Sequence, residues 1–354
     1  MLWPLAIALG VCALSACDAA YIAVQGRGQV GLLLRARPVG ELVRGETDPE
    51  RAWHWALAWS AREFARDRLQ LAVTDQYERG IDLQRNAAAY VVSAAPAYDL
   101  APYRWDFPLL GAVPYKGFFD PSEARAEAAR LATGGLDVMV REVSTYSLLG
   151  WLPDPLLSSV IEEPPERVVE VVIHELAHAT VYAPGASEFD EGLATFIGRR
   201  GRLEFMAEKL GADSPALALA QRIDDDADRY REAVLAQAQD LSSYYATPAP
   251  TAAGKQRIFA RHQRLYAESA HELNTAAYRA AKLPANNAEV AALAVYTFNS
   301  QLYASAFAVV GHDWPAFIAL LRDVAVADEP QLALRDRVQA ALAQRAASLQ
   351  AGPR

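Results

Sequence analysis

Cysteine is almost absent from this chain of 354 residues. Its two cysteines, Cys12 and Cys17, both lie at the extreme N-terminus, and none follows residue 17. A disulfide framework, a cysteine nucleophile and a cysteine-ligated metal site are therefore excluded from the rest of the chain. A body without cysteine suits an oxidising compartment.

Positive charge is also scarce. The chain has 34 Lys and Arg against 43 Asp and Glu, which gives a formal net charge of −9. This balance offers no electrostatic basis for binding nucleic acid. We find no glycine-rich phosphate loop and no internal repeat. With 52% hydrophobic and 22% charged residues, the composition is typical of a globular protein.

Long hydrophobic runs are missing apart from one at the start, "MLWPLAIALGVCALSA" (1–16). It is shorter than the roughly 20 residues that span a bilayer, and it has the apolar centre and small-residue end of a secretory signal. Its continuation "LSAC", Leu14 to Cys17, resembles the lipobox of bacterial lipoproteins. The resemblance implies that Cys17 is lipidated and anchors the body to a membrane of the cell envelope, facing the periplasm. Because no Lys or Arg precedes the run, a short buried N-terminal helix is the alternative.

The remaining pattern predicts one folded unit, residues 17–354, of the α+β class and mostly α-helical. Residues 17–163 combine helices with a small β-sheet, and residues 164–354 are nearly all helical. Turn and cap signals and hydrophobic periodicity mark the elements. We expect helices at 30–43, 48–70, 120–133, from about 154, within 164–185, and at 188–210, 213–245, 254–283, 287–309, 313–323 and 329–348, with strands inside 86–119 and 134–146.

The stretch "VVIHELAHAT" (171–180) carries the first chemical signal. Residues four apart share one face of a helix, so His174 and His178 can both reach one ion. Glu175 lies beside that face and can touch a water on the ion. This is the HExxH zinc arrangement. The alternative is a pair of core histidines beside a buried acid, but burying Glu175 among apolar residues costs several kcal/mol unless a partner such as a cation is present.

A catalytic zinc ion needs a third protein ligand and one open position. Immediately downstream, "ASEFDEGLATFIG" (186–198) offers Glu188, Asp190 and Glu191 at the start of a helix. Each of these acids could instead simply complement the helix dipole. The segment between His178 and Glu191 is long enough for a turn and an antiparallel return.

The pair "HELAH" and "DEGLA" resembles the gluzincin metallopeptidases. The resemblance implies that Glu191 is the third ligand, that Gly192 and Ala194 keep the helices close, and that Asp190 replaces the usual asparagine. More of the chain is similar to the bacterial putative aminopeptidase lipoproteins. The matching stretches are the lipobox, "GLLLRARPV", "WDFPLLGAVPYKGFFD", "STYSLLGWLPDPLLSS", the HELAH helix and "EFDEGLATFIG". This resemblance covers most of residues 17–200 and implies a zincin-like, zinc-dependent peptidase.

The resemblance also implies roles in catalysis. Glu175 is the expected general base, and a tyrosine is the expected second oxyanion donor, for which Tyr146 is preferred over Tyr182, Tyr296 and Tyr303. Each of these tyrosines could instead be an ordinary packed side chain. A peptide substrate could add as a strand along residues 137–143. We find no motif for a substrate α-amino group. The other open classes are a non-catalytic binding or scaffold lipoprotein and a zinc hydrolase of non-peptide amides.

Overall fold

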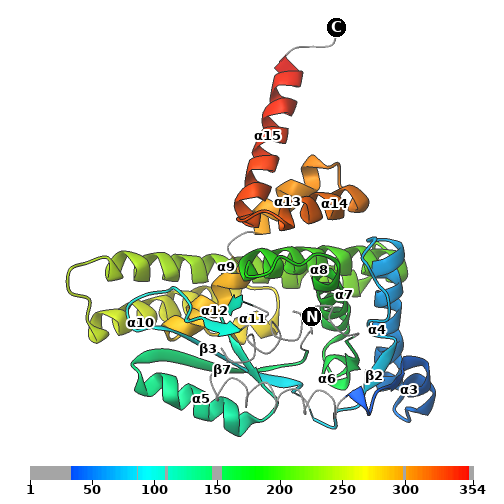
Figure 1. The fold of residues 1–354 in the computed structure, drawn as a ribbon, viewed down its shortest axis with the longest axis horizontal. Coiled ribbons are helices and arrows are strands. Elements are labelled where there is room, and N and C mark those ends of the chain that lie inside the picture. Colours follow the sequence, from blue (N-terminus) through cyan, green and yellow to red (C-terminus); the bar gives the residue numbers. More distant parts are fainter. Residues whose placement is uncertain (1–32, 86, 108–110, 146–153, 298–299, 351–354) are drawn as a thin grey trace, which may run out of the picture.

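The computed structural model describes residues 33–85, 87–107, 111–145, 154–297 and 300–350. Most of this chain is helical and three small sheets accompany the helices, as the sequence predicts. In Figure 1 the largest sheet and the helix beneath it lie at one end of the molecule and α3, α4 and α6 at the other, with α9 running across both. Cys17 lies outside the described residues.

The N-terminal part contains short strands and few helices. Its elements are β1 (Arg37–Pro38), α3 (Val39–Gly45), α4 (Pro49–Asp67), β2 (Arg79–Ile81), β3 (Ala89–Pro96), β4 (Trp105–Phe107), β5 (Gly111–Val113), β6 (Lys116–Phe118), α5 (Pro121–Thr133), β7 (Leu136–Val143), β8 (Leu156–Leu157) and α6 (Ser158–Ile161). The predicted helix at 30–43 is correct only from Val39, where α3 begins, because Arg37 and Pro38 pair with β2 as a strand. Asp48 and Asp120 are the N-cap residues of α4 and α5, and each side chain accepts hydrogen bonds from the first turn of its helix.

The main sheet has the strand order β6-β3-β7, with all pairs antiparallel. Side chains alternate across β3, so that Val92 and Ala94 contact α5, while Ala95 faces α12. The sheet is thus covered on both faces. Strand β7 pairs with β3 along its whole length, and no described strand pairs with its other edge.

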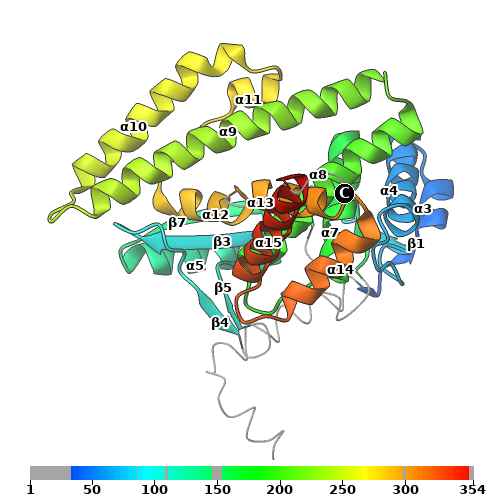
Figure 2. The ribbon, with the colours of Figure 1, turned by 90° about the horizontal axis from the view of Figure 1, so that it is seen from above.

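The C-terminal part is helical. Its elements are α7 (Pro165–Thr180), α8 (Ser187–Leu210), α9 (Pro215–Tyr245), α10 (Ala252–Ser269), η1 (Ala270–Glu272), α11 (Ala276–Ala280), α12 (Asn287–Thr297), α13 (Ser300–Val309), α14 (Trp314–Ala325) and α15 (Pro330–Gln350). Figure 2 shows α9, α10 and α11 side by side along one edge of the molecule.

One of the predicted helices ends early. The helix expected at 254–283 ends at Ser269, because the fully buried carboxylate of Asp226 accepts hydrogen bonds from the backbone and side chains of Asn274 and Thr275. Those bonds replace the helical ones that the pattern predicts. Within the helix expected at 287–309, the structure describes α12 and α13, and residues 298–299 between them lie outside the described residues.

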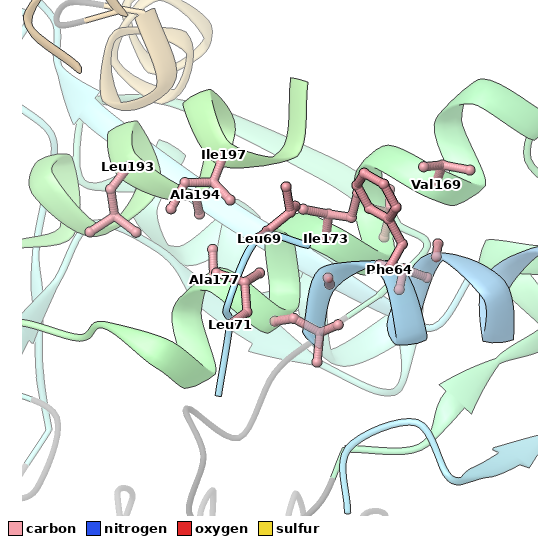
Figure 3. Packing of buried hydrophobic residues seen from close by; sticks show 14 of the residues in the cluster. Phe64, Leu69, Leu71, Val169, Ile173, Ala177, Leu193, Ala194 and Ile197 are labelled. Carbon is pink, nitrogen blue, oxygen red and sulfur yellow. The ribbon is translucent and has the colours of Figure 1, made fainter. Parts of the chain in front are cut away.

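The principal hydrophobic core forms where α7 lies between α4 and α8 (Figure 3). Phe64 and Leu69 from the α4 side meet Ile173 of α7 and Ile197 of α8, and all four side chains are buried. Each large apolar side chain buried in this way contributes about 1.5–3 kcal/mol. The core therefore fixes α7 and α8 against each other.

A charge network lies beside this core, and we call it the α7–α9 charge network. Its seven side chains are Arg167 and Glu170 on α7, Arg199 and Arg202 on α8, and Asp224, Asp228 and Arg231 on α9. Arg202 is 2% exposed and donates to Glu170 over 2.6 Å and to Asp224 over 2.6 Å. The network thus joins three helices through one buried guanidinium group.

Among the described helices, none by itself combines the length and apolar character needed to cross a membrane. The segments Gln301–Val309 and Trp314–Ala325 reach those criteria only as a pair, and the chain bends by 120° between them.

Candidate metal centre

Helix α7 presents two histidine side chains on the same face. It begins after Pro164 and carries His174 and His178 one turn apart near its C-terminal end. Their Nε2 atoms lie 3.2 Å from each other, and their rings meet at 82°. Other positions of the helix carry buried apolar residues such as Val172 and Leu176, which fix it in the core.

The third side chain comes from the N-terminal part of α8, just after its first turn. The Oε2 atom of Glu191 lies 3.4 Å from Nε2 of His174 and 3.6 Å from Nε2 of His178. In the part of the chain that the structure describes, this is the one group of three or more His, Cys, Asp or Glu ligand atoms close enough together to hold a metal ion. Two nitrogens and one oxygen form a donor set suited to a divalent transition metal. The three predicted ligands could therefore bind a metal ion together.

The structure of the turn between α7 and α8 explains why Glu191, and neither Glu188 nor Asp190, lies close to the two histidines. Asp190 directs its carboxylate to the backbone N–H of Ala183, 2.8 Å away, and so closes the turn. Glu188 is exposed. Of the acids at the start of α8, only Glu191 reaches the histidines.

Small residues let α8 approach its neighbours. A Cβ atom on Gly192 would lie 2.6 Å from the ring of Tyr303 on α13, so this glycine makes room for that tyrosine. The close approach to α7 is at Gly198, where a Cβ atom would lie 3.0 Å from the Glu170 carbonyl oxygen and 3.2 Å from Cβ of His174.

The ligand side chains form an ion pair without a metal. Burial raises the pKa of the Glu191 carboxyl, but hydrogen bonds from His174 and His178 outweigh burial and hold that pKa well below its usual range. Burial lowers the pKa of His178, yet the hydrogen bond and charge of Glu191 raise it to about 9. Burial also raises the pKa of Asp190 to about 7, against the hydrogen bond from Ala183. Near neutral pH a proton on His178 therefore balances the Glu191 carboxylate.

Metal affinity should consequently increase about tenfold for each pH unit between about pH 7 and pH 9. Below the raised pKa of His178, its proton must leave before the imidazole can bind a metal; above that pKa no proton remains and the increase should stop. A competition titration against a chromophoric chelator, corrected for the chelator's own protonation, measures this slope. A constant affinity across the interval would show that His178 carries no proton in the metal-free protein.

Glu175 and the candidate tyrosines occupy different environments. Glu175 follows His174 on α7 and is half-buried. Tyr303 is fully buried and donates its hydroxyl hydrogen to the Phe189 carbonyl oxygen over 2.9 Å, so it supports the first turn of α8. Tyr182 is half-buried, and burial raises its pKa. Tyr146 and the side chain of Tyr296 lie outside the described residues.

A fifth tyrosine near the site escaped the sequence analysis. Tyr77 is 5% exposed and interacts electrostatically with the Glu175 carboxylate, although almost 100 residues separate the two in the chain. The sequence around it, "DQYERG", has no catalytic motif and no helical or strand period. Only the folded chain brings it to α7.

Comparison with protein families gives one match. The model of the family described as "Putative aminopeptidase" matches residues 20–334. The match covers most of the chain, which therefore belongs to this family. No curated protein and no solved structure matches the chain.

Proposed function

We propose that this member of the family is a zinc-dependent peptidase of the gluzincin type with a zincin-like fold, anchored in the bacterial cell envelope through acylated Cys17. The family description supports a peptidase, and more specifically an aminopeptidase. The metal, the reaction and the location are inferences from the site and the sequence.

One observation carries the proposal of zinc. Zinc binds imidazole nitrogen and carboxylate oxygen at about 2.0–2.2 Å, and tetrahedral angles then place two ligand atoms about 3.4 Å apart. The three separations among His174, His178 and Glu191 are 3.2, 3.4 and 3.6 Å. Three protein ligands leave a fourth position open, as catalytic zinc sites require.

The side chains around this position suit peptide hydrolysis. Bound zinc would polarise a substrate carbonyl and lower the pKa of a water to about 7. Glu175 is next to His174 on α7, where its carboxylate can take a proton from the attacking water. As the carbon–oxygen bond forms and the carbon–nitrogen bond breaks, Glu175 returns that proton to the leaving amine. The negative charge of Glu191 partly offsets the charge of the cation.

Strand β7 suits an extended peptide. None of the described strands pairs with its second edge, and Val140, Arg141 and Glu142 have exposed side chains. A peptide pairing along this edge would be held mainly by backbone hydrogen bonds, which accept many sequences.

The proposal is tested by metal analysis together with cleavage of a peptide mixture. We expect about one zinc ion per chain, cleavage that stops when a phenanthroline chelator removes the metal, and recovery when zinc is restored. An aminopeptidase should cleave free peptides and leave their N-acetylated forms intact. Cleavage that survives complete metal removal would contradict the mechanism, whereas bound zinc without any cleavage would support the binding-module alternative.

A further inference from the structure

One side chain from a distant helix contacts the residues on both sides of Glu191. Tyr303 of α13 is fully buried, and its hydroxyl group donates to the Phe189 carbonyl oxygen over 2.9 Å. Its ring covers Gly192, where a Cβ atom would lie 2.6 Å from the ring carbon Cε2 and 2.9 Å from the hydroxyl oxygen. Phe189 precedes Glu191 by two positions, and Gly192 follows it directly. Tyr303 therefore holds the backbone that carries the Glu191 side chain.

This contact requires a glycine at position 192. Non-bonded carbon atoms pack best at about 3.5–4.0 Å, so a side chain at this position would have to displace either the ring of Tyr303 or the backbone of α8. The ring has little room to move, because it belongs to the principal core together with Phe189 and Phe307, and all three side chains are buried. The distance between α8 and α13 at this point is thus closely fixed.

Glu191 itself faces the two histidines of α7. Its Oε2 atom lies 3.4 Å from Nε2 of His174 and 3.6 Å from Nε2 of His178. Metal–ligand distances tolerate deviations of only about 0.2 Å. Because Glu191 is 9% exposed, its side chain has little freedom to compensate for a shift of the helix that carries it. A small displacement of the α8 backbone would therefore move the carboxylate out of the position that a metal ion needs.

We infer that Tyr303 is a positioning residue for the carboxylate ligand Glu191. It holds the backbone of residues 189–192 at the distance from α7 at which the carboxylate lies close to both imidazoles. The inference rests on the proposed function for the identity of the metal, but the contacts of Tyr303 exist with or without peptidase activity. The role differs from that of an oxyanion donor, because the buried hydroxyl group already donates its hydrogen to the Phe189 carbonyl oxygen.

The first test compares zinc binding by Tyr303→Phe and Tyr266→Phe. Phenylalanine keeps the buried ring and removes only the hydroxyl group. Tyr266 of α10 is a matched control, since it is 6% exposed and donates to the Tyr278 carbonyl oxygen over 2.8 Å, within a different hydrophobic cluster. Loss of a group that supports a metal ligand typically weakens binding by about 10- to 100-fold. We expect a loss of about tenfold in Tyr303→Phe and of less than about twofold in Tyr266→Phe, measured by competition with a chelator. Wild-type affinity in Tyr303→Phe, or equal losses in both variants, would overturn the inference.

The second test is a double-mutant cycle of Gly192→Ala and Tyr303→Leu, with zinc affinity as the measured quantity. Gly192→Ala places a methyl group against the ring, and Tyr303→Leu removes that ring. Each single change should weaken zinc binding. The double variant should bind zinc at least about fivefold more tightly than the product of the single losses predicts, because leucine leaves room for the methyl group. Losses that simply multiply would show that the contact between residues 192 and 303 does not set the position of Glu191.

The third test needs no metal. Hydrogen exchange of backbone amides, followed by mass spectrometry of the metal-free protein, measures how firmly residues 189–193 are held. We expect exchange in this segment to be about two- to tenfold faster in Tyr303→Phe, the factor that corresponds to the net free energy of one hydrogen bond, and unchanged in Tyr266→Phe. Equal exchange in all three proteins would contradict the inference. If the wild type binds no zinc or cleaves no peptide, the proposed function fails, while this comparison still decides whether Tyr303 holds the backbone around Glu191.

Discussion

Replacing Glu175 with glutamine should lower the peptidase rate by about 10²- to 10⁴-fold, which is the usual contribution of a general acid–base group. Glutamine has the shape of glutamate but accepts no proton at neutral pH. Because Glu175 does not belong to the ligand triangle of His174, His178 and Glu191, zinc should remain bound. The measurement is kcat/KM on a susceptible peptide, together with zinc content determined by mass spectrometry on the same sample.

Glu188→Gln is the matched control for this change. It removes the same charge from the first turn of α8, but the side chain of Glu188 is exposed and lies outside the ligand triangle. We expect it to alter the rate less than about threefold, since an exposed charge is well screened by solvent. Equal activity of wild type and Glu175→Gln on every peptide would remove the enzymatic interpretation altogether.

The largest effect on stability is expected for Arg202→Met. Methionine occupies a similar volume but leaves Glu170 and Asp224, which are 15% and 17% exposed in their side chains, without their shared partner. Breaking a buried ion pair by removing one member typically costs about 3–5 kcal/mol. That is a large fraction of the 5–15 kcal/mol that stabilises a typical domain. Urea unfolding of the zinc-free protein measures the loss.

Arg200→Met is the control for Arg202→Met. It shows whether the loss of stability is specific to the buried arginine or follows from removing an arginine from α8. Arg200 also forms an ion pair, with Glu204 at 2.7 Å, but its side chain is 47% exposed. Exposed pairs contribute about 0–1 kcal/mol, so this variant should unfold at nearly the wild-type urea concentration. Similar losses in both variants would indicate that burial of the α7–α9 charge network contributes nothing to stability.

The parts of the fold that depend on local signals could be predicted from the sequence. Helices α4, α5 and α7 lie within the ranges that the pattern predicts for them. Predictions of secondary structure failed where a residue distant in the sequence determines the local conformation. The Asp226 carboxylate accepts hydrogen bonds from Asn274 and Thr275, and the helical pattern stops before these residues. Arg37 and Pro38 form a strand because they pair with β2. Neither partner can be identified from local periodicity.

The residues of the candidate site also differ in how far the sequence alone predicts them. The spacing of His174 and His178 lies within one helix, so the sequence alone indicates that the two rings converge. The assignment of Glu191 as the third ligand required the resemblance of "DEGLA", because the sequence offers three acids near the start of this helix. In the structure, Asp190 instead accepts a hydrogen bond from the backbone N–H of Ala183. Tyr77 gave no signal, since its place beside α7 depends on a φ of +61° and on the hydrogen bond from Arg62 to the neighbouring Gln76 carbonyl oxygen.

The three side chains of the ligand triangle differ in their exposure to solvent. The side chain of His174 is 19% exposed, against 7% for His178 and 12% for Glu191. The Glu191 side is backed by Tyr303, which fills the space over Gly192. Solvent therefore reaches the ligand triangle most readily at His174, the residue that precedes Glu175 on α7.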